Sequence, residues 1–168
     1  MELTGDQCVG VGKSTAAEKD LVYTFDEALK SDLGEVQQLE VETYGDDAYP
    51  YVVLRQFLDM SGELFQVCRD DGGNVIAYGI VARSVNQDSG WLLSVAVSLP
   101  YRRKGIGTTL IKKLLGKAEI CSIKKIFLTV APSNEAAIFL YKALGFTVVE
   151  VEHHYYGPDE DRVVMCRS

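Results

Sequence analysis

The stretch Val95-Ala-Val-Ser-Leu-Pro-Tyr-Arg-Arg-Lys-Gly-Ile-Gly-Thr-Thr-Leu110 decides the fold, because an apolar strand passes through a basic, glycine-containing turn into a helix. Apolar residues alternate with smaller or more polar ones from Trp91 to Val97, a pattern typical of a strand. Pro100 lacks the N–H that a ladder requires, so it predicts the end of that strand. Beyond the turn, apolar residues recur at helical spacing from Ile106 to Ala118, which predicts an amphipathic helix.

The turn itself predicts a phosphate site. Gly105 and Gly107 let the backbone approach a ligand without an intervening Cβ, and the first N–H groups of a helix attract anions. Eight Lys and Arg residues lie between Arg102 and Lys125 against one acidic residue, Glu119, although the whole chain has a net charge of −7. We therefore expect a small ligand with several phosphates at the turn and a cationic second partner at the acidic remainder of the surface.

Composition indicates one soluble domain. The 168 residues are 47% hydrophobic and 24% charged, and residues 1–20 are polar and without periodicity. We expect a flexible leader over 1–20 and a single domain over 21–168. The leader contains Gly10-Val-Gly-Lys-Ser-Thr15, which looks like a phosphate-binding loop, but Gln7 stands where that motif requires its first glycine.

Several classes of protein are excluded on the same grounds. The acidic net charge argues against a nucleic-acid partner, and no apolar run is long enough for a membrane span. The chain begins without the features of a secretory signal, so we expect a cytoplasmic protein. Its widely spaced cysteines are expected to be free thiols, and the adjacent His153 and His154 have no companion at ligand spacing, so we expect no metal.

The element order predicted for the whole chain is β-α-α-β-β-β-α-β-α-β-β, which indicates an α/β fold. The strand–helix–strand unit that runs through the basic turn and ends at Val130 implies parallel neighbouring strands. Asp32 is expected to cap the first helix. The predicted strands are 21–25, 64–68, 75–82, 91–97, 125–130, 146–152 and 162–167, and the predicted helices are 33–43, 51–60, 106–118 and 135–144.

Two motifs in this order resemble those of the GNAT superfamily of acetyl-CoA-dependent N-acetyltransferases. Arg102-Arg-Lys-Gly-Ile-Gly107 is similar to the family's Gln/Arg-X-X-Gly-X-Gly/Ala signature, and Ser133-Asn-Glu-Ala-Ala-Ile-Phe-Leu-Tyr-Lys-Ala-Leu-Gly-Phe146 is similar to its second block. The resemblance implies a single GNAT domain with a mixed, twisted sheet of about seven strands flanked by about four helices. It also implies acetyl-CoA as co-substrate.

The resemblance further implies which residues hold acetyl-CoA. Backbone N–H groups from 102 to 108 would bind the pyrophosphate, a strand edge would bind the pantetheine arm, and the second block would contact the cofactor. Tyr141 would be the general acid that protonates the departing thiolate, since a phenol is protonated at neutral pH. The implied cofactor-binding residues are Val95, Ala96, Val97, Arg102, Arg103, Lys104, Gly105, Ile106, Gly107, Thr108, Asn134, Ala137 and Tyr141.

Within the superfamily, the chain resembles most the N-terminal protein acetyltransferases of the ribosomal-protein-alanine type. Tyr49-Pro50-Tyr51 is similar to their aromatic turn between the first two helices, and Tyr155 and Tyr156 are similar to their paired tyrosines between the last two strands. The resemblance implies that Tyr49, Tyr51, Tyr155 and Tyr156 wall the groove through which the peptide enters.

One position departs from those relatives. Thr129 stands where they place a Glu or His that acts as general base, and a threonine hydroxyl is no base at neutral pH. Four other residues could supply a base by composition alone, but we expect each to be a solvated surface group: Glu40, Glu42, His153 and His154.

The sequence thus predicts transfer of an acetyl group from acetyl-CoA to a primary amine by direct attack in a ternary complex, without metal. A peptide N-terminal α-amine is the leading acceptor. A small cationic amine, such as a polyamine or aminoglycoside, and a non-catalytic acyl-CoA sensor remain alternatives. We expect a monomer or a homodimer, and neither a nucleic acid nor a membrane as partner.

Overall fold

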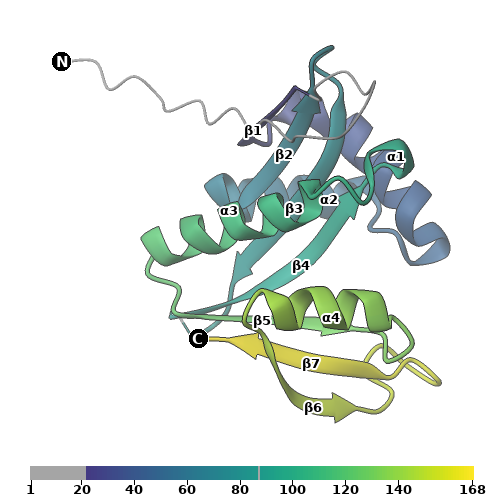
Figure 1. Ribbon diagram of the computed structural model, residues 1–168, viewed down its shortest axis with the longest axis vertical. Helices are drawn as coiled ribbons and strands as arrows, with labels where there is room; N and C mark the ends of the chain where they lie inside the picture. The colour runs from purple at the N-terminus through teal and green to yellow at the C-terminus, as the bar shows by residue number, and fades with distance from the viewer. Residues whose placement is uncertain (1–21, 87) are drawn as a thin grey trace, which may run out of the picture.

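Seven strands form one mixed sheet in the computed structural model, which describes residues 22–86 and 88–168 (Figure 1). Their order across the sheet is β1-β2-β3-β4-β5-β7-β6. Every neighbouring pair is antiparallel except β4 and β5, which are parallel as the sequence predicts. The strands are β1 (Tyr23–Glu27), β2 (Phe65–Asp70), β3 (Val75–Arg83), β4 (Ser89–Val97), β5 (Lys125–Val130), β6 (Thr147–Glu152) and β7 (Arg162–Arg167).

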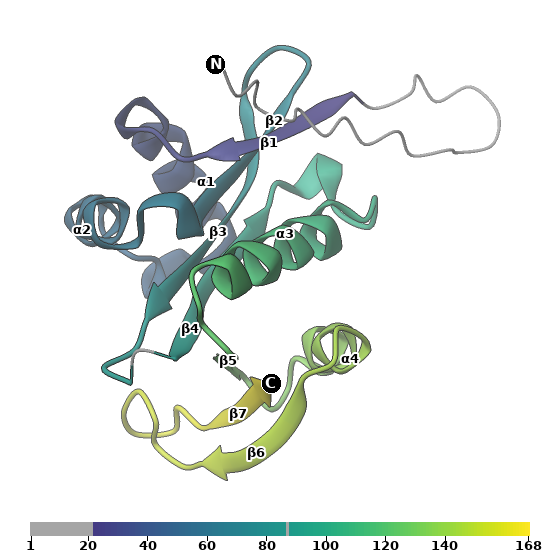
Figure 2. The same cartoon turned by 90° about the vertical axis from the view of Figure 1, so that its left-hand side faces the viewer.

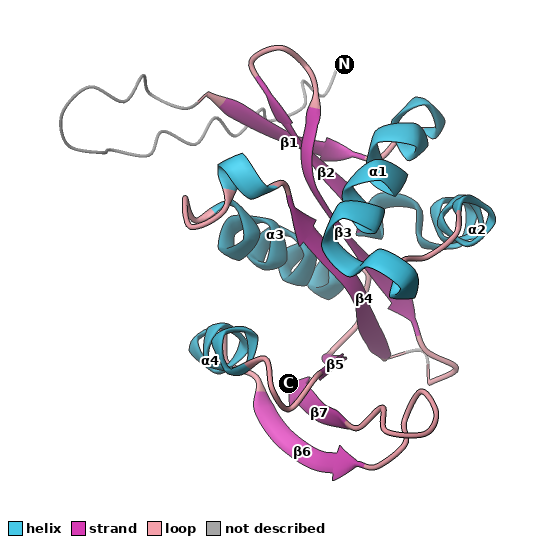
Figure 3. Cartoon of the chain, turned by 90° about the vertical axis from the view of Figure 1, so that its right-hand side faces the viewer, coloured by secondary structure: helices cyan, strands magenta, loops and turns pink. Residues whose placement is uncertain are grey.

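Four α-helices in the described part of the chain cover the two faces of this sheet. Figures 2 and 3 show α1 and α2 on one face, with α3 and α4 on the other. They are α1 (Leu33–Tyr44), α2 (Tyr51–Ser61), α3 (Ile106–Ile120) and α4 (Glu135–Ala143). The α/β fold class and the element order are confirmed. The predicted leader and its Gly10–Thr15 segment lie outside the described residues.

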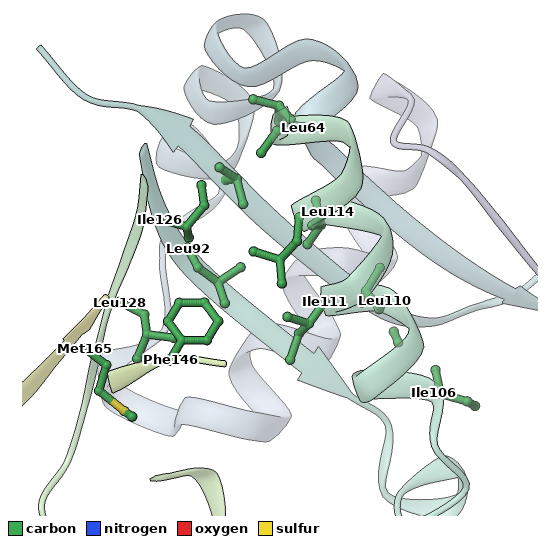
Figure 4. Packing of buried hydrophobic residues seen from close by; sticks show 14 of the residues in the cluster. Leu64, Leu92, Ile106, Leu110, Ile111, Leu114, Ile126, Leu128, Phe146 and Met165 are labelled. Carbon is green, nitrogen blue, oxygen red and sulfur yellow. The ribbon is translucent and has the colours of Figure 1, made fainter. Parts of the chain in front are cut away.

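The core divides into two clusters, one on each face. On the α3 face, Ile106, Leu110, Ile111 and Leu114 are buried and pack against sheet residues and Phe146 (Figure 4). The predicted amphipathic helix is therefore confirmed. On the opposite face, apolar residues of α1 and α2 pack against β2 and β3.

A β-bulge in β4 breaks the predicted alternation. Ile80 of β3 pairs with Ser94, but the next residue, Val81, pairs with Leu92, which leaves Leu93 as the extra residue. Leu93 therefore packs against the α1–α2 cluster, whereas Val95 packs against the α3 cluster. The expectation that both side chains share one face was wrong, because a bulge shifts the period by one residue.

Beyond its first three residues, β4 separates from β5. Only Ser89–Trp91 pair with Lys125–Phe127, and no pairing joins the later residues of the two strands. Figure 1 shows the two strands side by side at one end and diverging toward the other. This separation leaves one edge of β4 open in the middle of the sheet.

Asp32 stands at the start of α1 but does not cap it as predicted. Its carboxylate accepts a hydrogen bond from Leu29 N–H at 2.7 Å and pairs with Arg69 at 2.7 Å. The nearly buried carboxylate is thus neutralised by a cation on β2 rather than by the helix it precedes.

Candidate active site

A cavity of about 580 Å³ lies where β4 and β5 diverge. That volume suits a small-molecule site. Elements from both faces of the sheet contribute to its wall: Glu40 and Tyr44 from α1, Asp47 and Tyr49 from the loop before α2, Leu92–Val95 from β4, Thr129–Ala131 from β5 and its end, Asn134, Ala137 and Tyr141 from α4 and its cap, and Tyr156, Glu160 and Arg162 from the last loop and β7.

The turn before α3 presents an anion site. Two of its residues have left-handed backbone, Arg103 with φ 63° and Gly105 with φ 80°. Backbone N–H groups in such a turn and in the first turn of a helix converge on one side and bind anions. From Arg103 to Thr108 these N–H groups have no partner among the described residues.

Arg102 differs from its neighbours in this turn. Its N–H donates to Leu99 O at 3.3 Å. Contrary to the prediction, this N–H is therefore not free to bind a phosphate. Its side chain donates from Nε to Val97 O at 2.7 Å. Arg102 therefore ties the turn to the end of β4.

The open edge of β4 borders the cavity at Val95. The Val95 carbonyl accepts a hydrogen bond from the Tyr44 hydroxyl at 2.8 Å, which reaches it from α1. Val95 is the member of the predicted pantetheine segment that lines the cavity, whereas Ala96 is buried in the α1–α2 cluster and Val97 packs against the α3 cluster.

Residues of the second motif meet at the opposite wall. Asn134 Oδ1 accepts the Ala137 N–H at 3.1 Å and so caps α4, and both residues line the cavity. Tyr141 also lines it and packs edge-on against Phe146, with ring centroids 5.7 Å apart. Burial raises the pKa of Tyr141 above that of an ordinary tyrosine. Its phenol therefore stays protonated at neutral pH and can act as a proton donor.

Tyrosines from two loops also lie at the cavity. Tyr49 and Tyr156 line it, and the Tyr156 hydroxyl is 3.1 Å from Thr129 Oγ1. Tyr155 packs edge-on against Tyr156, with centroids 4.7 Å apart, but neither Tyr155 nor Tyr51 lines the cavity. Of the four predicted groove residues, two therefore border the cavity directly.

Glu40 is not the solvated surface group that we expected, since only 1% of it is exposed. Its Oε1 accepts the Tyr49 N–H at 3.1 Å, and its Oε2 accepts the Ser94 hydroxyl at 3.1 Å. The Tyr78 hydroxyl lies 2.8 Å from Ser94 Oγ. Burial raises the pKa of Glu40, although the hydrogen bonds from Tyr49 and Ser94 partly oppose that shift.

The sequence contained a signal for this burial. Glu40 stands four residues after Val36 and seven after Leu33, on the stripe of α1 that is buried. The other three candidate bases are exposed as predicted, and His153 is held by Asp161 with Nδ1 at 2.7 Å from a carboxylate oxygen.

Sequence reasoning also missed an ion pair at the cavity. Arg162 is 2.7 Å from a Glu160 carboxylate oxygen, and its guanidinium lies over the Tyr156 ring, 4.8 Å from the centroid. Nothing in the local pattern marks these residues, because the β6–β7 loop brings them to the cavity.

Within residues 22–86 and 88–168, no helix is long and apolar enough to cross a membrane. The same residues hold no group of three or more His, Cys, Asp or Glu side chains placed to bind a metal.

Residues 27–146 match the acetyltransferase (GNAT) family. The chain belongs to the GNAT acetyltransferase family. It is 32% identical over 162 residues to an N-alpha-acetyltransferase of Sulfurisphaera tokodaii. The aligned region covers 89% of this chain and 95% of the relative.

Two solved structures share the GNAT fold with this chain. The ribosomal-protein-S18-alanine N-acetyltransferase of Escherichia coli has a TM-score of 0.71 and 25% identity, over 86% of this chain and 92% of that one. A phosphinothricin acetyltransferase of Sinorhizobium meliloti in complex with acetyl-CoA has a TM-score of 0.74 and 21% identity, over 86% and 87%. Acetyl-CoA is the acetyl donor that the family uses.

Proposed function

We propose that the chain acetylates the α-amine at the N-terminus of a peptide or protein, with acetyl-CoA as donor. One observation carries the proposal: a single cavity joins the open edge of β4 and Tyr141 to the aromatic side chains of Tyr49 and Tyr156. A donor and an acceptor that both enter this cavity would therefore meet inside it. Similarity to an N-alpha-acetyltransferase and to a ribosomal-protein-S18-alanine N-acetyltransferase supports a peptide acceptor.

Acetyl-CoA would lie along the turn before α3 and the open edge of β4. The free N–H groups from Arg103 to Thr108 would bind the pyrophosphate, with the charges of Arg103 and Lys104 nearby. The pantetheine arm would follow the edge of β4 at Val95. This arrangement would place the thioester beside Tyr141 and Asn134, which line the same cavity.

The reaction then needs no covalent enzyme intermediate. The neutral amine attacks the thioester carbonyl carbon, a C–N bond forms, and the C–S bond breaks as the tetrahedral intermediate collapses. Tyr141 gives its proton to the departing thiolate, and the proton that the new amide nitrogen sheds restores the phenol. Proton donation by a positioned group is worth about 10²–10⁴-fold in rate.

The acceptor would approach between the loop before α2 and the β6–β7 loop. Tyr49 and Tyr156 supply flat apolar faces with polar ends, which suit the backbone of an extended peptide. The Thr129–Tyr156 contact holds one of these rings in place. Asp47 adds negative charge that would attract an ammonium group.

A panel of acceptors tests the proposal through thiol release from acetyl-CoA. We expect short peptides with a free N-terminus to be acetylated, and the same peptides with a blocked N-terminus to be inert. Faster turnover of polyamines or aminoglycosides than of every peptide would favour a small-amine enzyme. Acetyl-CoA binding without transfer to any amine would favour an acyl-CoA sensor.

A further inference from the structure

We propose that Glu40 accepts the proton that the acceptor amine must lose before it attacks the thioester, an inference that rests on the proposed acetyl transfer. A protonated amine has no lone pair for attack, so a group near the thioester must take its proton, directly or through a water molecule. Thr129 cannot do so, and its hydroxyl already lies 3.1 Å from the Tyr156 hydroxyl.

The position of Glu40 separates it from the other acids at the cavity. Of the three carboxylates in the wall, Glu40 alone is buried. Asp47 is exposed, and Glu160 is held by Arg162 at 2.7 Å. The guanidinium of Arg162 thus occupies a carboxylate oxygen of Glu160.

Hydrogen bonds fix the carboxylate at the proposed reaction site. Ser94, which donates to Oε2, directly precedes Val95 at the open edge of β4. Tyr49, whose N–H donates to Oε1, belongs to the proposed acceptor wall. Glu40 thus joins the donor strand and the acceptor loop, so it lies where the two substrates would meet.

The same contacts leave Glu40 able to accept a proton. Each carboxylate oxygen can accept two hydrogen bonds, and each receives one from the described residues. Burial in the cavity strengthens the base by raising its pKa.

Among the described residues, Arg162 is the only cation in the cavity wall, and it is paired with Glu160. The titratable groups around the Glu40 carboxylate are Tyr44 on α1, Asp47 and Tyr49 in the loop before α2, Tyr78 on β3, Tyr156 and Glu160 in the β6–β7 loop, and Arg162 on β7.

The proton balance closes without a further reactant. The ammonium group gives one proton to the Glu40 carboxylate, and the neutral amine attacks. Tyr141 protonates the thiolate and regains a proton from the new amide nitrogen. Glu40 then releases its proton to water, which accounts for the single proton that acetylation of an ammonium group liberates.

The test compares Glu40→Gln with Glu42→Gln, a matched control on the exposed face of the same helix. We expect Glu40→Gln to lower kcat/KM for a peptide by about 10²-fold at neutral pH, with unchanged acetyl-CoA affinity. Its kcat/KM should rise tenfold per pH unit up to the amine pKa of about 8, because only amine already neutral in solution can react. The wild-type and Glu42→Gln profiles should be flat over that range.

Two results would overturn the inference. One is a kcat/KM of Glu40→Gln within twofold of wild type. The other is a pH profile of kcat/KM that is lower than that of wild type but parallel to it at every pH, which is the signature of a structural role. If Glu40→Gln does not fold, the wild-type profile decides, because a unit slope below the amine pKa would exclude an enzyme base. Failure of the wild-type protein to acetylate any amine would instead refute the proposed function.

Discussion

Replacement of Tyr141 by Phe removes the proposed proton donor and little else. The ring would keep its edge-on contact with Phe146, whose centroid is 5.7 Å away. Tyr141 lines the cavity, and its hydroxyl has no hydrogen-bond partner among the described residues, so its loss leaves no protein group unsatisfied. We therefore expect the free energy of unfolding to change by less than about 1 kcal/mol.

The catalytic loss should be far larger. Without a donor the sulfur must leave as a thiolate, and general acid catalysis of this kind is worth about 10²–10⁴-fold in rate, or about 3–5 kcal/mol of activation free energy. We expect kcat of Tyr141→Phe to fall by that factor while the dissociation constant of acetyl-CoA stays within threefold of wild type.

Thiol release gives kcat, titration calorimetry gives acetyl-CoA affinity, and thermal unfolding gives stability. Tyr23→Phe is the matched control, since Tyr23 is buried in the same core cluster but does not line the cavity. A kcat of Tyr141→Phe within threefold of wild type would refute the assignment of Tyr141 as the acid. So would an equal loss in Tyr23→Phe.

Three further changes probe other parts of the site. Gly105→Ala places a Cβ on left-handed backbone with φ 80°, so we expect a loss of about 1–2 kcal/mol in stability and weaker acetyl-CoA binding by calorimetry; unchanged binding would contradict the anion site. Thr129→Val and Tyr156→Phe each remove the 3.1 Å contact, so each should raise KM for the peptide severalfold and the double variant no more than either; additive effects would contradict the contact. Burial raises the pKa of Glu40 above its ordinary value of 4.5, so protonated Glu40 stabilises the folded state. This contribution to the free energy of unfolding is complete below pH 4.5 and is lost as the pH rises through the pKa of the folded state. Denaturant unfolding should show this decline in wild type and not in Glu40→Gln.

Elements with strong local patterns were predictable from the sequence. The apolar repeat of α3 and the alternation in β5 are encoded by neighbouring residues, and Lys125–Val130 begins and ends where predicted. The turn at Gly105 was predictable for the same reason, because a glycine before an amphipathic helix permits left-handed backbone.

Features set by tertiary packing were not predictable in the same way. The bulge at Leu93 depends on the register with β3, since both faces of β4 are covered and either phase of the alternation buries apolar side chains. The burial of Glu40 depends on β4, which supplies Ser94, and on the loop that supplies Tyr49 N–H. Arg102 is a different case, because its N–H and side chain bind the nearby carbonyls of Leu99 and Val97, and its residue type does not distinguish that local role from ligand binding.

The position of the transferred acetyl group tests the central claim most directly. The protein is incubated with acetyl-CoA and a peptide that has a free N-terminus and an internal lysine, and fragmentation of the product by tandem mass spectrometry locates the modification. We predict acetylation at the α-amine alone, with the lysine side chain unmodified. Acetylation confined to the lysine, or none while small amines are acetylated, would contradict the account.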